Sequence, residues 1–126
     1  MTDRLTCVIA EDEQIFRDAL TRLLGGAWPD LDIVAACEDG GSALEAIGDQ
    51  QPDIAFLDIR MPGLTGLEVA AAAAEASPGT QIVFVTAYDQ YAIDAFERGA
   101  VDYLLKPIAE DRLESTIRRL KGRAAA

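Results

Sequence analysis

Five side chains of this sequence that could do chemistry each follow an apolar segment. Three carry carboxylates, one a hydroxyl and one an ammonium group: they are Glu11, Asp12, Asp58, Thr86 and Lys106. Carboxylates that gather within a few ångströms of one another need a cation between them, because their charges repel. Mg²⁺ suits a few carboxylates together with water and phosphate oxygens. The acids of this set therefore indicate a Mg²⁺ site.

Asp58 is the candidate nucleophile of the set. A carboxylate can attack phosphorus and form an acyl phosphate. Phosphoryl transfer between anions needs positive charge around the phosphoryl group, which Mg²⁺ and Lys106 can supply, while Thr86 offers a hydroxyl donor. The chain has no histidine, which excludes imidazole-dependent catalysis and the commonest zinc sites. The phosphate must therefore come from outside the chain.

Taken singly, each of these side chains has an ordinary structural explanation. The acidic triplet 11–13 suits the start of a helix, where acids meet the positive end of the helix dipole. Lys106 precedes a proline, where a lysine is commonly an exposed charge, and Thr86 suits a bond to the local backbone. Only the joint placement of the five side chains at strand ends indicates a functional site.

Composition limits the possible classes of protein. The length of 126 residues fits one domain, which we expect over residues 1–121, with 122–126 as the start of a linker or C-terminal tail. The net charge of −11 argues against direct binding of nucleic acid. We find neither a membrane-spanning segment nor a secretory signal. Cys7 and Cys37 lie in apolar stretches, which indicates a reduced, cytoplasmic protein.

Short apolar segments alternate with segments of helical periodicity. The apolar segments are rich in Val and Ile, as expected for strands buried on both faces; they are 5–10, 33–37, 54–57, 82–85 and 101–105. A strand followed by a helix, five times over, predicts an α/β fold with a parallel sheet between two layers of helices. We expect the flavodoxin-like (βα)5 doubly wound sheet with strand order 2-1-3-4-5. Ligands of such sheets bind at the carboxyl ends of the strands, where the five side chains lie.

The sequence also suggests where the helices begin and end. We expect the first helix to stop at Gly25–Gly26. The second is expected to begin at Ser42 and the third at Thr65, each with a glutamate three residues later, as in a capping box. The fourth is expected over 91–98. The fifth follows Ala109, a poor capping residue, which predicts a weak first turn.

The residues described so far resemble those of a known family, the receiver domains of bacterial two-component response regulators. The resemblance covers about 5–120. It is carried by the stretch Asp-Ile-Arg-Met-Pro-Gly-Leu-Thr-Gly at 58–66 and by Glu11, Asp12, Thr86, Lys106 and Pro107.

The resemblance implies a metal site, a reaction and a partner. Its Mg²⁺ ligands are the carboxylates of Glu11, Asp12 and Asp58 and the backbone carbonyl of Arg60. Asp58 receives its phosphoryl group from the phosphohistidine of a sensor histidine kinase. The Lys106–Pro107 peptide bond is implied to be cis.

The resemblance also implies a conformational switch. On phosphorylation the hydroxyl of Thr86 moves toward the phosphoryl group, and the ring of Tyr103 turns into the vacated space. Tyr103 can also be read as a half-buried strand aromatic whose hydroxyl meets water, and the two readings are compatible, one in each state of the switch. The phosphate must bind the active packing more tightly than the inactive one. Homodimerisation through the fourth helix, fifth strand and fifth helix is implied as well.

A narrower resemblance indicates which output the protein controls. Residues 86–106 look like receivers attached to LytTR-type DNA-binding domains, which implies control of transcription by a domain beyond Ala126. A stand-alone receiver that acts by protein–protein contact is the alternative. In both cases we expect no nucleic-acid or membrane contact by this domain itself.

Two other functions compete with the switch. One is a Mg²⁺-dependent phosphohydrolase with an aspartyl nucleophile; such enzymes resemble one another in an Asp-x-Asp pair. Here Arg60 stands two residues after Asp58, and a guanidinium cannot donate a proton at neutral pH. The other is a pseudo-receiver, which would lack an acid, the threonine or the lysine; all are present. We therefore expect no enzyme activity beyond self-phosphorylation and self-dephosphorylation.

Overall fold

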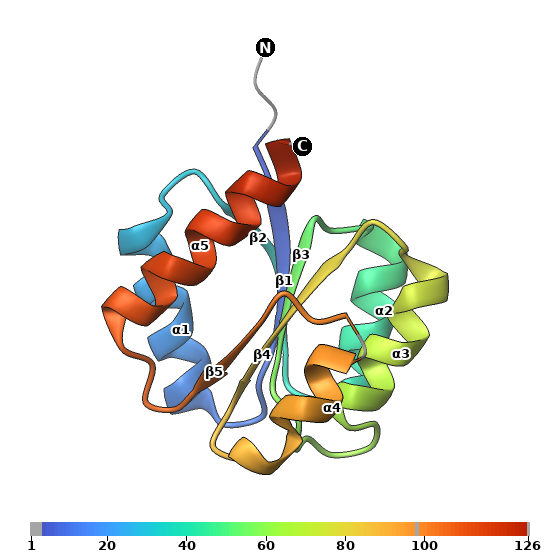
Figure 1. The fold of residues 1–126 in the computed structure, drawn as a ribbon. Helices are drawn as coiled ribbons and strands as arrows, with labels where there is room; N and C mark the ends of the chain where they lie inside the picture. Colours follow the sequence, from blue (N-terminus) through green and yellow to red (C-terminus); the bar gives the residue numbers. More distant parts are fainter. Residues whose placement is uncertain (1–3, 98, 126) are drawn as a thin grey trace.

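A five-stranded parallel sheet forms the centre of the protein (Figure 1). The computed structural model describes residues 4–97 and 99–125. The strand order is β2-β1-β3-β4-β5, which confirms the predicted flavodoxin-like topology. The strands are β1 (Thr6–Ala10), β2 (Asp32–Cys37), β3 (Ile54–Leu57), β4 (Gln81–Thr86) and β5 (Asp102–Leu105).

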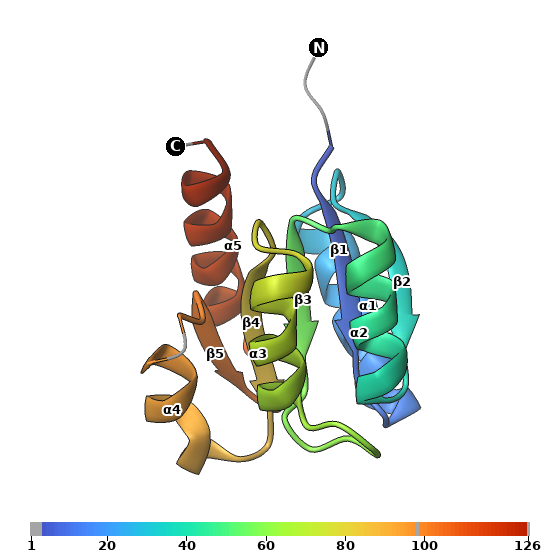
Figure 2. The ribbon, with the colours of Figure 1, turned by 90° about the vertical axis from the view of Figure 1, so that its right-hand side faces the viewer.

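Helices cover both faces of the sheet (Figures 1 and 2). One face carries α1 (Gln14–Ala27) and α5 (Glu110–Ala125). The other carries α2 (Gly40–Gln50), α3 (Gly66–Ala76) and α4 (Ala92–Glu97), and a short 3-10 turn η1 (Asp89–Tyr91) leads into α4. None of the helices in the described residues is long and apolar enough for a membrane crossing.

The central strands β1 and β3 are buried on both faces, which explains their apolar sequences, whereas the edge strand β2 is mostly half-exposed. Ile9 and Phe56 face α1 and α5 in one core cluster. Val8 and Leu57, one position along, face α2 and α3 in the other. Because side chains alternate between the faces of a strand, every position of a central strand must be apolar.

The register of the strands brings their ends to one edge of the sheet. Ala10 pairs with Leu57, and Leu57 pairs with Phe84. The backbone pairing continues one residue further, because the Asp58 amide donates to the Ala10 carbonyl at 2.9 Å. The Lys106 amide donates in the same way to the Thr86 carbonyl at 3.0 Å. The sheet itself therefore fixes the main chain of the predicted site residues.

The end of α1 and the start of α2 differ from the prediction. Helix α1 continues through Gly25–Gly26 to Ala27, and the Trp28 amide still donates to the Leu24 carbonyl at 2.7 Å. Trp28 is buried in the core beside α5, and this packing outweighs the low helix propensity of the glycines. Helix α2 begins at Gly40 rather than Ser42, because the Asp39 carboxylate accepts from the Ser42 amide at 2.7 Å and is the N-cap.

The expected start of the third helix is confirmed. The Thr65 hydroxyl accepts from the Glu68 amide at 3.2 Å, and the Glu68 carboxylate accepts from the Thr65 amide at 3.0 Å. This reciprocal capping box fixes the first turn of α3. The predicted fourth helix over 91–98 is present as α4 over 92–97, with Tyr91 in the preceding turn η1. Position 98 lies outside the described residues.

Helix α5 is tied to β5 by a buried carboxylate. Asp102 is fully buried, and its oxygens accept from Arg112 at 2.6 and 2.9 Å and from Arg119 at 3.0 Å. Burial alone would raise the pKa of Asp102, but hydrogen bonds from Arg112 and Thr116 lower it to about 2. This anchor explains why the first turn of α5 is formed although Ala109 is a poor cap.

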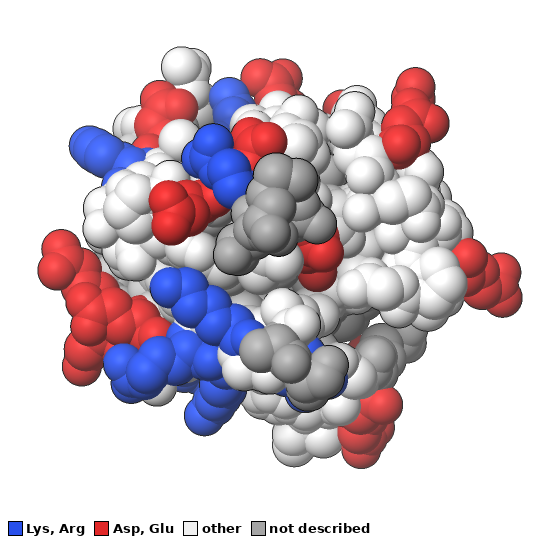
Figure 3. Space-filling view, turned by 90° about the horizontal axis from the view of Figure 1, so that it is seen from above, with Lys and Arg blue, Asp and Glu red and all other residues white. Residues whose placement is uncertain are grey.

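Helix α5 extends further than the sequence suggested. It reaches Ala125, so the described part of the expected tail at 122–126 is helical. Four basic residues stand in its last turns, namely Arg118, Arg119, Lys121 and Arg123. Figure 3 shows one group of Lys and Arg side chains at the lower left of the end of the molecule that it views, and others among acidic side chains at the upper left. Positive charge at a helix C-terminus is favourable, because it faces the negative end of the dipole.

Gly66 provides a test of how α3 holds the loop that carries Asp58. A Cβ at position 66 would collide with the carbonyl group of Asp58 and lie 3.0 Å from the Ile59 Cα. We predict that Gly66→Ala lowers the free energy of unfolding by about 2 kcal/mol. Gly48→Ala is the matched control: it meets nothing within 4 Å inside α2 and should stabilise by about 0.5–1 kcal/mol. Urea unfolding measures the free energy of unfolding of both variants. An unchanged value for Gly66→Ala would contradict the close approach of Gly66 to the Asp58 carbonyl.

Candidate functional site

Three of the predicted site residues form one buried cluster at the carboxyl edge of the sheet. Lys106 Nζ donates to Asp58 Oδ2 at 2.9 Å and forms an ion pair with Glu11 Oε1. Glu11 and Asp58 are only 3% and 5% exposed. The ammonium also lies 4.5 Å from the centre of the Phe16 ring. The cluster thus holds two carboxylates and one ammonium away from water.

The electrostatics of the cluster differ from those of exposed groups. Burial raises the pKa of Glu11 to about 7, although hydrogen bonds from Lys106 and the Glu13 amide act in the opposite direction. Burial would lower the pKa of Lys106, but its bonds to Glu11 and Asp58 raise it overall. The lysine therefore stays charged, whereas Glu11 is close to releasing its proton at neutral pH.

One oxygen of Asp58 is left without a partner. Oδ1 is buried and accepts no hydrogen bond from the described residues. A buried carboxylate oxygen without a donor is costly, and such atoms commonly mark an ion or water site. The hard oxygen donors around it are those that Mg²⁺ prefers. The residues present therefore fit the expected cation.

The acidic triplet after β1 supplies further oxygens. One carboxylate oxygen each from Glu11, Asp12 and Glu13 lies within 4.8 Å of the others. Glu11 is buried, while Asp12 and Glu13 are exposed. Asp58 is not part of this group and meets Glu11 through Lys106 instead. Glu13 was not among the expected ligands, because the family resemblance that gave the ligand set does not include this position.

Thr86 and Tyr103 lie beside the cluster. Thr86 is fully buried at the end of β4, and its Oγ1 accepts from the Tyr88 amide at 3.4 Å. Tyr103 is 7% exposed, and its hydroxyl donates to the Tyr88 carbonyl. The reading of Tyr103 as half-buried with its hydroxyl in water is therefore wrong for this state, because the β4–α4 loop covers it.

The side chain of Arg60 has aromatic partners that the sequence did not reveal. Its guanidinium lies 4.1 Å from the centre of the Tyr88 ring and donates to the Tyr91 hydroxyl at 3.2 Å. These contacts link the loop after Asp58 to the turn before α4. The Lys106–Pro107 peptide bond is cis, as expected.

A known protein family matches most of the chain. The family model described as the response regulator receiver domain matches residues 7–118. The chain belongs to this family. Receiver domains are the regulatory phosphoacceptors of two-component systems, and the chain shares this classification with its curated relatives.

Two relatives illustrate the similarity. An uncharacterised response regulatory protein of Vibrio cholerae is 48% identical over 121 residues, which cover 96% of this chain and 46% of that protein. The transcriptional regulatory protein BtsR of Salmonella typhimurium is 48% identical over 114 residues, which cover 90% and 47%. The receiver domain therefore spans about half the length of the curated relatives that it matches.

Solved receiver structures share the fold over nearly the whole chain. The receiver domain of AraT from Geobacillus stearothermophilus has a TM-score of 0.89 and 31% identity, covering 98% of this chain and 97% of that one. The response regulatory domain of mrkE from Klebsiella pneumoniae has a TM-score of 0.87 and 32% identity, covering 94% and 97%.

The raised pKa of Glu11 predicts a dependence of stability on pH. The folded protein keeps the Glu11 proton up to about pH 7, whereas the group's ordinary pKa is 4.5. The folded state therefore binds more protons between these values, and its stability falls as the pH rises through them. We predict that, without divalent ions, the free energy of unfolding of the wild type falls between pH 4.5 and about pH 7 by up to about 3 kcal/mol more than that of Glu11→Gln. Urea unfolding at several pH values measures it, and equal slopes for both proteins would show that Glu11 titrates normally.

Proposed function

We propose that this receiver domain accepts a phosphoryl group on Asp58 from the phosphohistidine of a sensor histidine kinase. The observation that carries the proposal is the buried Asp58 Oδ1, which has no hydrogen-bond partner among the described residues. Its other oxygen is held by Lys106. A carboxylate held on one side and unengaged on the other suits a nucleophile that must meet an incoming phosphorus atom.

The transfer exchanges one bond to phosphorus for another. Asp58 attacks the phosphorus, the bond from phosphorus to the kinase imidazole nitrogen breaks, and that nitrogen keeps the electron pair. Lys106 neutralises charge on a phosphoryl oxygen, and the Thr86 hydroxyl donates to another. The carboxylates of Glu11, Asp12 and Asp58 and the carbonyl of Arg60 would hold Mg²⁺, which supplies positive charge to the phosphoryl oxygens. Water later hydrolyses the acyl phosphate, so the protein is a switch and not an enzyme with an external substrate.

Arg60 favours this role over the phosphohydrolase. A hydrolase needs a general acid two residues after its nucleophile, and the group there is a guanidinium held between Tyr88 and Tyr91. Arginine stays protonated at any physiological pH. The position is therefore suited to shield an acyl phosphate and not to protonate a leaving group.

The switch proceeds through Thr86 and Tyr103 to a surface on α4, β5 and α5. Large apolar side chains are exposed there, with Ile93 at 76%, Phe96 at 48% and Leu105 at 46%. Phe96 and Leu105 line a hollow of about 390 Å³ that also includes Tyr103. Exposed apolar groups around a hollow are typical of a protein–protein interface. We propose that phosphorylated copies dimerise through this surface.

The proposed output is transcription control in the cytoplasm through a LytTR-type DNA-binding domain outside this chain. The support is the resemblance of residues 86–106 together with the length of the relatives, one of which is named a transcriptional regulatory protein. The net charge of −11 keeps the receiver itself away from DNA.

Phosphorylation of Asp58 is tested with acetyl phosphate and Mg²⁺. We predict that intact-mass analysis of a fresh sample shows one added phosphoryl group on the wild type and none on Asp58→Asn. Asp49→Asn, which changes an exposed carboxyl of α2, is the matched control and should be modified like the wild type. Modification of Asp58→Asn to the same extent would place the phosphate elsewhere and contradict the proposal.

Lys106→Ala tests whether the lysine transmits the signal. The fold should persist, because Glu11 can take up a proton when its cationic partner is lost. We predict that beryllofluoride with Mg²⁺ shifts the wild type toward dimers in light scattering, while Lys106→Ala stays at its unliganded mass. Equal dimerisation of both proteins at matched occupancy of Asp58 would remove Lys106 from the switch.

A further inference from the structure

A mostly apolar pocket that is partly open to solvent lies between α1 and the connection from β5 to α5. Its volume is about 170 Å³. Phe16 and Ala19 line it from α1, Phe56 and Val85 from the sheet, and Ile108 from the β5–α5 connection. Nothing in the proposed phosphorylation chemistry uses this space.

The charged groups of the pocket select against a charged ligand. Only Glu11 and Lys106 bring charge to its lining, and they are paired with each other. The ammonium is satisfied further by Asp58 and by the face of the Phe16 ring. The ammonium already faces two carboxylates and is not free for an anion, and the remaining negative charge of the cluster is met by the cation expected at the edge of the sheet. A further ionic ligand would therefore lose its hydration without gaining a partner.

The volume of the pocket limits the size of the ligand. An apolar protein cavity of about 150 Å³ lined by Leu, Ile and Phe stays dry and binds benzene. The present pocket is slightly larger, and its lining is mostly Ala, Val, Leu, Ile and Phe. It is more open than such a cavity, because Ile15 in its lining is 80% exposed. We propose that it is a binding site for a small, neutral molecule with a single aromatic ring.

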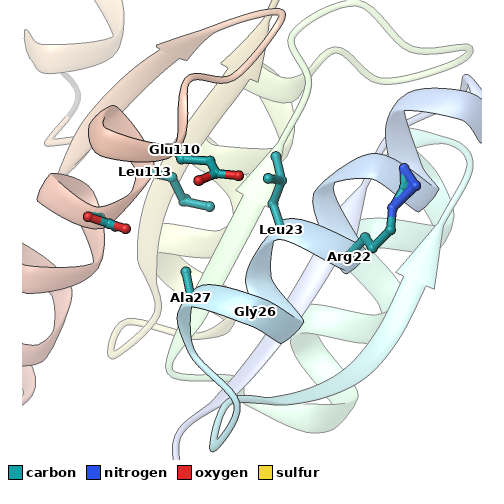
Figure 4. Close-up of a pocket in the computed structure, with 7 residues that line it drawn as sticks. Arg22, Leu23, Gly26, Ala27, Glu110 and Leu113 are labelled. Carbon is teal, nitrogen blue, oxygen red and sulfur yellow. The ribbon is translucent and has the colours of Figure 1, made fainter.

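A neighbouring hollow beside α1 and α5 does not share this mostly apolar lining. It has a volume of about 290 Å³ and shares Leu23, but Glu110, Glu114 and Arg22 line it. Figure 4 shows the Glu110 carboxylate reaching toward Leu23, while the Arg22 side chain points away. A hollow with three charged side chains in its lining offers less apolar surface to an aromatic ring, so the proposed ligand is expected in the first pocket.

Occupancy of the pocket is coupled to the phosphorylation site through Lys106. Its stem is part of the pocket lining, and its ammonium holds Asp58. A phosphoryl group that draws the ammonium away from Glu11 and Phe16 also removes the lysine stem from the pocket lining, so we expect the ring to bind less tightly. Linkage then requires that the ring weaken binding at the phosphorylation site by the same factor. This coupling rests on the proposed function of Asp58, whereas the binding site itself does not.

Binding is tested with benzene on the whole chain by NMR. We expect saturable shifts of the Val85 and Ile108 methyl resonances, with half-saturation at about 1 mM, which is ordinary for a ligand of six heavy atoms. Ala19→Leu places extra carbon in the pocket and should weaken binding by at least about tenfold. Ala74→Leu on α3, which lines a different hollow, is the matched control and should bind like the wild type. Thermal unfolding shows whether both variants are folded.

Several results would overturn the site. These are no saturable shift in the wild type, unchanged binding to a folded Ala19→Leu, or equal loss in both variants. Tighter binding of benzoate than of benzene would overturn the neutral character of the ligand. The coupling is tested separately by repeating the titration with beryllofluoride and Mg²⁺: an affinity at least about twofold lower supports it, and an equal affinity rejects it without affecting the site.

Discussion

The ion cluster of Lys106 with Glu11 and Asp58 is the interaction on which the site depends. Two carboxylates and one ammonium are buried together, so one negative charge has no partner unless a proton or a cation supplies it. The raised pKa of Glu11 and the unpartnered Asp58 Oδ1 are two expressions of this imbalance. A buried charge that lacks a partner is costly in a folded protein. The same imbalance makes the edge of the sheet a receptive place for a divalent ion and a phosphoryl group.

The sequence predicted the sheet and the residues at its edge for a physical reason. Strands buried on both faces must be apolar at every position, and residues 54–57 matched β3 at both ends. A parallel sheet delivers the residues after its strands to one edge, so the meeting of Asp58, Glu11 and Lys106 follows from their places in the chain. The capping box of Thr65 is equally local, since both partners lie within one turn.

The remaining features depend on contacts between distant segments. Gly25–Gly26 lies inside α1 because Trp28 is buried against the core. Tyr103 is covered because its hydroxyl finds the Tyr88 carbonyl, a loop atom with no signature in the sequence. Arg60 reaches the same loop through the rings of Tyr88 and Tyr91. Local patterns cannot encode such partners, because they arise only after the chain has folded.

Titration with Mg²⁺ tests the central role of the charge imbalance most directly. Isothermal calorimetry on the wild type should show one ion bound per chain. Asp12→Asn removes a carboxylate of the acidic group at the site and should weaken binding by at least about tenfold, since charged oxygen ligands dominate Mg²⁺ affinity. Asp49→Asn, which alters an exposed carboxyl of α2, should bind like the wild type. Equal Mg²⁺ affinity in all three proteins would contradict a cation site at this edge of the sheet.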